Sequence, residues 1–408
     1  MTRHATPGAT SDVEARDLRR RFRRLVRGAC FLAAVAALWP LIPDVNSSLW
    51  IPALSPFVAV AGAIATRGFH AVTWLGLVVG VVVLVKRRFF CRWICPMGFC
   101  LDGANWLGYR LGGKPIHVPL LGPWIVLLTL GGACLGYPLL LWLDPLAIFT
   151  GVFSLGERPL GYAVCLAAAG FATVFALTIL WPNAWCGRVC PLGAFQDLLH
   201  RVSRVPRFVA GRSDASHKAS GDLSRRAVLG VAAGVGSAGI VGLVRSDKHR
   251  PVRPPNAREE SRFVGLCTRC GNCVRSCPTG IIERDMGGHG LASLLTPVLS
   301  FRDGYCREDC VRCTEVCPSG AIVRLPARDK AGVRIGLPRV DMNICLLAED
   351  RECSACARWC PYGAIRYVFS EEQYALQPQI DLEKCNGCGA CEAACPTKPH
   401  KAIVVLPA

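Results

Sequence analysis

The feature that most constrains this chain is a closely spaced run of four cysteines that begins at Cys267 and ends in Cys277-Pro278. Written as a pattern, the run reads C-x2-C-x2-C-x3-C-P. Three thiolates at this spacing can grip one face of a [4Fe–4S] cube, while the fourth points away toward a neighbouring cube. The proline fixes its own φ and stiffens the turn after the fourth cysteine. The spacing therefore predicts an iron–sulfur site with a second site close by.

The chemistry of this run is repeated three more times before the C-terminus. Sixteen of the 24 cysteines fall into four runs, each closed by Cys-Pro. The runs are Cys267/Cys270/Cys273/Cys277, Cys306/Cys310/Cys313/Cys317, Cys345/Cys353/Cys356/Cys360 and Cys385/Cys388/Cys391/Cys395. Sixteen thiolates match the ligand requirement of four [4Fe–4S] clusters, and soft sulfur ligands favour iron–sulfur over harder metals. The runs can pair as neighbours or be nested, first with fourth and second with third, and the sequence does not choose.

Disulfides and structural zinc are the alternative uses of these cysteines. A disulfide framework has no reason to repeat four runs that all end in Cys-Pro. Four thiolates can bind zinc, but zinc sites rarely use a three-plus-one spacing with a terminal proline. The chain also lacks a C-x-x-C-H haem motif and a G-x-G-x-x-G stretch after a strand pattern. Iron–sulfur clusters are therefore the favoured cofactors.

The first 245 residues differ from the rest of the chain, because most of the apolar sequence lies there. The chain is 52% hydrophobic with a mean hydropathy of +0.34, which is high for an ordinary soluble protein. Four apolar stretches have about the length that crosses a membrane, allowing for tilt. They are 25–43, 70–85, 119–143 and 160–181. Basic residues beside them, such as Lys86-Arg87-Arg88, are typical of cytoplasmic flanks and do not form a nucleic-acid-binding face.

The same half contains an internal repeat with its own cysteines. Both copies read C-x3-C-P-x-G-x3-D, with Cys91 and Cys95 in the first and Cys186 and Cys190 in the second. Ser55-Pro56-Phe57 precedes the first copy much as Asp144-Pro145-Leu146 precedes the second. The repeat predicts two helix pairs that each end in a cysteine pair. The four thiolates could bind a further cluster or form redox dithiols; the alternative is buried cysteines in helix-capping turns. Asp144 falls in a predicted outer loop, where a polar residue is usually a solvent anchor.

The expected fold class is a mostly α membrane domain of four spans, with a fifth span or a Tat segment, joined to an α+β ferredoxin-like polyferredoxin domain. Arg225-Arg226 stands before a Gly/Ala-rich segment, which is the pattern of a twin-arginine (Tat) export signal. The alternative is a plain fifth span. The predicted parts are a basic arm at 1–24, the membrane domain at 25–200, a basic linker at 201–226, the Tat-like or fifth segment at 227–244, a linker at 245–262 and the polyferredoxin domain at 263–408.

These motifs give the chain a resemblance to known families. The first half, with its motifs at Cys91/Cys95 and Cys186/Cys190, resembles NapH-type membrane ferredoxins. From Arg225-Arg226 on, the chain is similar to NapG/MauM-type exported ferredoxins with four cluster runs. It looks like a fusion of the two. The first half is also similar to NosR-type proteins, whose flavin-bearing outer domain is absent here. The resemblance implies quinol oxidation and electron delivery to a periplasmic reductase such as nitrate reductase.

We therefore expect a membrane-anchored protein that relays electrons from quinol, through the C-x3-C-P motifs and the four clusters, to a periplasmic reductase or its small electron carrier. The expected location is the bacterial inner membrane, multi-pass, with the polyferredoxin domain on the periplasmic side. The expected partners are membrane lipid, the quinone pool and that reductase, and not nucleic acid. One alternative is an accessory protein that matures a metalloenzyme such as nitrous oxide or nitrate reductase. A third hypothesis keeps the C-terminal domain in the cytoplasm, where it would serve a cytoplasmic enzyme.

Overall fold

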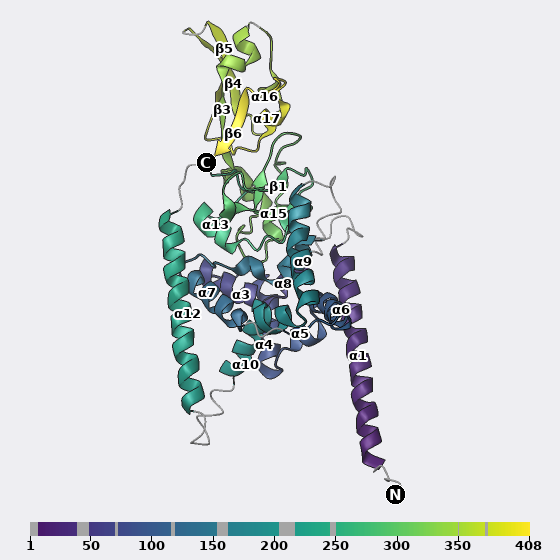
Figure 1. Ribbon diagram of the computed structural model, residues 1–408. Coiled ribbons are helices and arrows are strands. Elements are labelled where there is room, and N and C mark those ends of the chain that lie inside the picture. The colour runs from purple at the N-terminus through teal and green to yellow at the C-terminus, as the bar shows by residue number, and fades with distance from the viewer. Residues whose placement is uncertain are drawn as a thin grey trace.

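A helical half, which ends at Val244, carries a C-terminal half of short helices and small sheets stacked on one end of it (Figure 1). The computed structural model describes residues 7–38, 49–69, 72–115, 119–152, 162–203, 217–244, 250–349, 351–371 and 374–408. Parts of the predicted arm (1–6), of three predicted spans (39–43, 70–71 and 160–161) and of both linkers (204–216 and 245–249) lie outside the described residues. Figure 1 shows α1 and α12 on opposite outer sides of the helical half.

The helical half is built from eleven described α-helices of very different lengths. In chain order they are α1 (Pro7–Leu38), α2 (Trp50–Ala53), α3 (Pro56–Thr66), α4 (Thr73–Val85), α5 (Phe89–Trp93), α6 (Pro96–Arg110), α7 (Leu121–Cys134), α8 (Pro145–Val152), α9 (Tyr162–Leu180), α10 (Pro191–Val202) and α12 (His217–Val244). A 3-10 turn (Leu141–Leu143) precedes α8, and a π-helical turn (Trp185–Val189) precedes α10.

Four of these helices begin with a proline that follows a capping side chain. Ser55 precedes α3 and Asp144 precedes α8, while Cys95 precedes α6 and Cys190 precedes α10. Each of these side chains accepts a hydrogen bond from a backbone N–H in the first turn of its helix. Proline suits the first helical position because its φ is already helical and its missing N–H leaves no donor to satisfy. The internal repeat of the sequence is therefore a repeat of helix starts.

The predicted four-span membrane domain is wrong. Across the part of the chain that the structure describes, no helix is both long enough and apolar enough to cross a membrane. The apolar sequence is divided among shorter helices instead. α4 has 13 residues and α7 has 14, which gives about 20 Å at 1.5 Å per residue, against roughly 30 Å for the hydrocarbon core of a bilayer. The same finding overturns the predicted multi-pass inner-membrane location.

The predicted Tat-like or fifth segment at 227–244 is the second part of α12, which packs along α7. The helix begins at His217, so the predicted boundary at 226 falls inside it. The two helix backbones come very close at Gly131 of α7, where an added Cβ would lie 2.3 Å from the carbonyl oxygen of Val231. Only glycine permits that approach.

The C-terminal half has short elements joined by long loops. Its helices are α13 (Glu260–Leu266), α14 (Asn272–Ser276), α15 (Arg312–Glu315), α16 (Ala355–Arg358) and α17 (Ala390–Ala394). Its strands are β1 (Ile282–Arg284), β2 (Pro297–Leu299), β3 (Gly336–Val340), β4 (Ile365–Ser370), β5 (Ala375–Ile380) and β6 (Ile403–Pro407). Short 3-10 turns lie at Leu291–Ser293, Ala327–Gly332, Met342–Ile344 and Leu346–Glu349. The fold is therefore a mixture of helices and small sheets.

The strands pair into three antiparallel two-stranded sheets, β1–β2, β3–β6 and β4–β5. In register, Ile282 lies opposite Leu299 and Val340 lies opposite Ile403. Because β3 pairs with β6, which lies after the last cysteine run, the C-terminal strand closes the part of the chain that contains the third and fourth runs. Figure 1 shows β4 and β5 at the end of the molecule farthest from the helical half.

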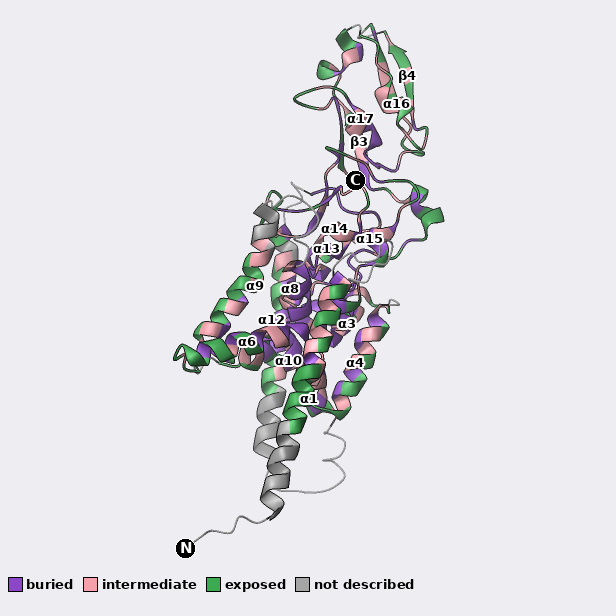
Figure 2. Ribbon diagram, turned by 90° about the vertical axis from the view of Figure 1, so that its right-hand side faces the viewer, coloured by how far each residue is buried: buried purple, intermediate pink, exposed green. Residues whose placement is uncertain are grey.

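Apolar side chains are buried in both halves and also where the halves meet. The core of the helical half is built around Phe57, Phe149 and Phe195, all almost fully buried, and Figure 2 shows buried residues gathered around α3 and α8. A second cluster joins Ala65 and Ala133 of the helical half to apolar residues of the C-terminal half, including Phe263. Burial of this shared apolar surface stabilises one arrangement of the two halves.

Candidate iron–sulfur centres

The first and fourth cysteine runs have the same local structure. α14 begins after Gly271, with φ 77°, and α17 begins after Gly389, with φ 82°. Glycine adopts this left-handed conformation without steric cost. Each helix ends at the fourth cysteine of its run, Cys277 or Cys395, whose backbone is extended because a proline follows. The fourth cysteine therefore leaves the direction of its own helix.

Site A combines the first three cysteines of the first run with the last cysteine of the second. We define it as Cys267, Cys270, Cys273 and Cys317. All four line one small cavity of about 30 Å³, and Cys277 is not among its lining residues. Burial, and after it the neighbouring thiols including Cys317, raises the pKa of Cys273. Three ligands from one run and one from the next is the exchange that a two-cluster ferredoxin requires.

Site B is the reciprocal group, Cys277, Cys306, Cys310 and Cys313. Burial raises the pKa of Cys313, and the thiols of Cys306, Cys277 and Cys310 raise it further. The first run therefore gives its fourth cysteine to the second run and receives Cys317 in return.

The third and fourth runs exchange cysteines in the same way. Site C is Cys360, Cys385, Cys388 and Cys391, and site D is Cys345, Cys353, Cys356 and Cys395. Burial raises the pKa of Cys388 to about 11, with Cys360 as the first thiol that adds to the shift. Burial likewise raises the pKa of Cys345, with contributions from Cys353 and Cys395. The structure therefore pairs the runs as neighbours and not as a nested set.

The four sites follow one another in space. Cys313 of site B is close enough to site A to affect the pKa of Cys273, after burial and the thiols of site A itself. The backbone N–H of Cys306, in site B, donates to the carbonyl of Cys388, in site C, at 2.9 Å. Cys356 of site D contributes to the raised pKa of Cys391, in site C, after burial and the thiols of site C. The spatial order is A, B, C, D.

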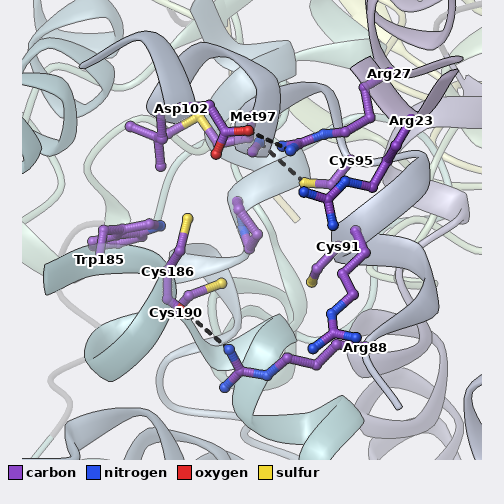
Figure 3. Close-up of a pocket in the computed structure, with 14 residues that line it drawn as sticks. Arg23, Arg27, Arg88, Cys91, Cys95, Met97, Asp102, Trp185, Cys186 and Cys190 are labelled. Carbon is purple, nitrogen blue, oxygen red and sulfur yellow. Dashed lines mark hydrogen bonds and ion pairs between the residues drawn. The ribbon is translucent and has the colours of Figure 1, made fainter. Parts of the chain in front are cut away.

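Site E is formed by the duplicated motif of the helical half, as Cys91, Cys95, Cys186 and Cys190. α5 and α6 supply the first pair, and the π-helical turn and α10 supply the second. All four thiols face one cavity of about 270 Å³ (Figure 3). Burial raises the pKa of Cys95 to about 12 and that of Cys190 to about 11. The helix-capping alternative is also met in part, since Cys95 and Cys190 do cap α6 and α10.

Two arginines place positive charge beside site E, and the aspartates that end the two motif copies hold them there. Arg27 forms an ion pair with Asp102, and Arg88 forms one with Asp197 at 2.7 Å. Burial alone would raise the pKa of Asp197, but hydrogen bonds from Arg87 and Arg88 hold it below its usual value. Figure 3 shows Arg27 and Arg88 beside the four cysteines. Their charges favour the thiolate forms that a metal cluster requires.

Asp144 lies in the core beside this site and not in a solvated loop. It is fully buried, and its Oδ1 accepts a hydrogen bond from the Ser55 hydroxyl at 2.6 Å. Burial raises its pKa to about 6, although Ser55 and two backbone N–H groups oppose the shift. The expectation of a solvent anchor is wrong, because the two helix starts that carry Ser55 and Asp144 meet in the interior.

α8 connects site E to site A. Pro145, at its first turn, lines the cavity of site E. Near its other end, the carbonyl of Gly151 accepts a hydrogen bond from Arg284 at 3.3 Å. Just before α8, the ring of Trp142 lies under the guanidinium of Arg269, a residue of the first run, at 5.1 Å. A helix of 8 residues is about 12 Å long, so sites E and A are neighbours across α8.

The residues present fit iron–sulfur clusters. Each site offers four thiols, and sites A and E enclose cavities that those thiols line. Within the described ranges, no three His, Cys, Asp or Glu side chains converge closely enough to hold a single metal ion. Four thiolates spread around a cavity are the ligands of a cage of several iron atoms.

Sequence reasoning found the cysteines but not the charged residues around them. Arg88 was expected to be a membrane flank, whereas it lies beside site E because Asp197 anchors it. Lys330, fully buried in the C-terminal half, carried no signal in the sequence. Asp144 did carry a signal in the sequence, because Asp144-Pro145-Leu146 occupies the same position in the internal repeat as Ser55-Pro56-Phe57.

Two family models match the chain over these sites. One, described as "4Fe-4S binding domain", matches residues 67–115 and 165–208, which contain the cysteines of site E. The other, described as "4Fe-4S dicluster domain", matches residues 266–321 and 351–398. Together with the thiol groups, the matches define a [4Fe–4S] protein of the ferredoxin type that carries out iron–sulfur electron transfer.

Curated relatives identify the family more closely. The Methylamine utilization ferredoxin-type protein MauM of Methylobacillus flagellatus is 35% identical over 163 residues, 38% of this chain and 68% of the relative. The Ferredoxin-type protein NapG of Escherichia coli is 37% identical over 167 residues, 38% of this chain and 70% of the relative. MauM of Paracoccus denitrificans is 30% identical over 208 residues, 49% of this chain and 91% of the relative. No solved structure matches the chain.

The chain belongs to the family of ferredoxin-type proteins that includes NapG and MauM. This confirms the NapG/MauM part of the resemblance. The likeness of the first half to NapH-type and NosR-type proteins stays a prediction.

Proposed function

We propose that the chain is a serial electron relay in which electrons enter at site E and pass through sites A, B, C and D in that order. The observation that carries this proposal is the spatial sequence of the five thiol groups. α8 separates E from A, Cys273 lies near Cys313, Cys306 is hydrogen-bonded to Cys388, and Cys391 lies near Cys356. Electron transfer between centres slows steeply with distance, so such a sequence favours one route.

The proposed cluster ligands are the sixteen cysteines of sites A to D, with one [4Fe–4S] cluster in each site, and the four cysteines of site E for one more. When bound, such clusters supply one-electron redox chemistry. The chain's own part is to set their spacing, burial and hydrogen bonding. The cavity at site E is wide and lined by arginines, whereas that at site A is about 30 Å³. This difference in cavity size supports site E as the place where electrons enter and site A as a centre that passes them on.

Hydroxyl groups after the Cys-Pro turns support a tuning role for the protein. Thr279, Ser319 and Thr397 each follow a fourth cysteine by two residues, and their hydroxyls lie 3.5, 3.8 and 3.2 Å from the thiols of Cys277, Cys317 and Cys395. Hydrogen bonds to the sulfurs of a cluster change its reduction potential. In the third run the position is Tyr362, and the thiol of Cys360 accepts from a backbone N–H at 3.3 Å instead.

Quinol is the proposed electron donor. A second cavity of about 330 Å³ shares Cys190 with site E and is lined mainly by apolar side chains, among them Trp124 and Leu198. Five charged side chains also line this cavity, and two of them, Arg88 and Asp197, form an ion pair. The five are Arg88, Arg188, Asp197, Arg201 and Arg226. An apolar cavity with a few convergent polar groups is the usual form of a site for an apolar ring compound.

The proposed acceptor is a reductase, such as periplasmic nitrate reductase, or its small electron carrier. This part of the proposal is supported by membership of the family that includes NapG. Site D would be the exit, because β4 and β5 beside it lie at the end of the molecule farthest from site E (Figure 1). Deletion of the gene separates a relay from a maturation factor. A relay predicts loss of quinol-driven reductase activity with dye-driven activity retained, whereas maturation predicts loss of both.

Ligand replacement tests the assignment of the clusters. In the full-length protein, Cys317→Ser should disturb the same EPR-active centre as Cys270→Ser, and Cys277→Ser should disturb the same centre as Cys306→Ser. If Cys277→Ser and Cys270→Ser disturb one and the same centre, the exchange between the runs is wrong. Fewer than three reducible [4Fe–4S] centres in the unaltered protein would contradict the relay itself.

A further inference from the structure

Lys330 is a buried basic residue beside the cysteines of site B. It lies in the 3-10 turn Ala327–Gly332, and none of its surface is exposed. Among the lysines whose side chains the structure describes, no other is fully buried. Lysine is almost never found in such a position unless its ammonium group has a charge partner.

The hydrogen bonds of Lys330 all lead to the second cysteine run. Its Nζ donates to the carbonyl of Arg307 and, at 2.5 Å, to the carbonyl of Cys310. Its ammonium group also lies within hydrogen-bonding reach of the thiol of Cys306. Two neutral carbonyls orient the ammonium group, but they supply no opposite charge.

A carboxylate does not supply the missing charge. Within the described chain, no Asp or Glu lies within ion-pair distance of Lys330. The charge of Lys330 does act on Asp309, but this carboxylate is exposed and already paired with Arg307 at 2.8 Å. A buried ammonium group without a charge partner is costly, so another buried group near Lys330 must supply the negative charge. The cysteines of site B would supply that charge as thiolates of a bound cluster, and Cys306, Cys310 and Cys313 are the ones beside Lys330.

We propose that Lys330 is a positioning residue that supplies the fixed positive charge of site B, acts as the charge partner of the cluster held there and raises its reduction potential. Reduction adds a negative charge, which a fixed cation nearby stabilises. Site B lies between sites A and C, so this residue affects the middle of the relay. The proposal rests on the cluster assignment made above.

The consequence for electron flow follows from that position. With Lys330 in place, an electron arriving from site A meets a centre whose reduced form is stabilised. Without it, the same step becomes less favourable, and all electrons bound for sites C and D must still pass through it. Loss of one buried charge should therefore lower a single potential and also slow the passage of electrons from A to C.

The test uses three variants of the full-length protein, loaded with iron and sulfide and titrated with redox dyes while EPR follows each centre. Lys330→Gln removes the charge but keeps an N–H donor for the two carbonyls, and Lys330→Met removes both. Lys114→Met is the matched control, because Lys114 is exposed and lies in the helical half, outside sites A to E. The expected result is that one centre shifts to lower potential in both Lys330 variants, while the other centres, and all centres of the control, stay unchanged.

The outcomes separate charge from packing. A shift in Lys330→Met with none in Lys330→Gln would overturn the proposal in favour of a hydrogen-bonding role. Full iron content with unchanged potentials in both variants would also overturn it, as would loss of all centres together, which marks a general folding role. Selective loss of one centre with the others retained would support the pairing of Lys330 with that centre. Failure of the relay assignment would appear separately, as missing centres in the unaltered protein.

Discussion

Site E and sites A to D bring four thiols together by different means. In the helical half, two cysteine pairs about 90 residues apart in sequence meet because two repeated helix starts pack together. In the C-terminal half, each site takes three thiols from one short run and one from the adjacent run. The first kind of site depends on the whole helical core. The second depends on local turns and on one exchanged cysteine.

The two kinds of site also differ in their surroundings. Site E opens to a cavity of about 270 Å³ that Arg23, Arg27, Arg88 and Arg92 help to line. Site A has a cavity of about 30 Å³. A wide, cationic cavity suits the arrival of a donor, whereas the narrow cavity of site A suits transfer between fixed centres. The comparison therefore divides the proposed relay into two parts: site E, where electrons enter, and sites A to D, which pass them on.

The largest expected effect comes from removing the entry. Cys186→Ser should remove the centre at site E and abolish reduction of the other centres by menadiol, a small quinol, while dithionite still reduces them. Rapid-freeze EPR after mixing measures both reactions. Cys100→Ser is the matched control, because Cys100 belongs to the helical half but not to site E. If menadiol reduces the other centres of Cys186→Ser at the normal rate, electrons do not need site E to enter the relay.

A smaller effect is expected where the two regions meet. Trp142→Ala removes the ring that lies under Arg269 at 5.1 Å and should slow electron transfer from site E to site A several-fold, with all centres retained. Trp106→Ala is the control, since Trp106 stacks on Arg110 at 4.1 Å and is not part of the contact between the halves. Equal rates in the two variants would show that the route avoids this contact.

Asp144 makes the stability of the helical half depend on pH. Its pKa is about 6 in the folded chain against 3.8 in the unfolded chain, so the folded state binds the proton more tightly. Its contribution to the unfolding free energy is present below pH 3.8 and is lost as pH rises through about 6, by about 3 kcal/mol in total. Denaturation of Asp144→Asn between pH 5 and 8 should show a flatter profile than the unaltered protein. Parallel profiles would contradict the burial of an acid beside site E.

The smallest expected effect concerns the arginines of site E. Arg88→Gln removes one positive charge beside the four thiols and should lower the reduction potential of that centre alone. Arg328→Gln is a suitable control, because Arg328 is exposed and lies in the C-terminal half. A redox titration followed by EPR compares the two. An unchanged potential in Arg88→Gln would mean that Arg88 serves only to anchor Asp197.

The sequence predicted the C-terminal sites far better than the fold around site E. Four runs such as Cys267 to Cys277 contain most of their ligand geometry in local spacing, so the grouping in threes follows from the pattern. Which run receives Cys277 or Cys395 depends on how the loops fold back, and no local pattern contains that information. The structure decides it in favour of neighbours.

The membrane prediction failed for a related reason. Hydropathy measures how apolar a stretch is but not where its side chains go, and residues such as Phe57, Phe149 and Phe195 are buried in a protein core. Proline at helix starts then divides the apolar sequence into pieces such as the 11 residues of α3. Lys330 was missed because a lysine in a loop is ordinarily solvated, and only its burial identifies it.

The central claim is that electrons pass through the sites in series, and interruption of site A tests it most directly. In Cys317→Ser, the proposed fourth ligand of site A is lost while the four cysteines of sites E, B, C and D all remain. Rapid-freeze EPR after mixing with menadiol should then show reduction at site E and little at sites B, C and D, although dithionite reduces all of them. Reduction of sites B to D by menadiol as fast as in the unaltered protein would contradict the account.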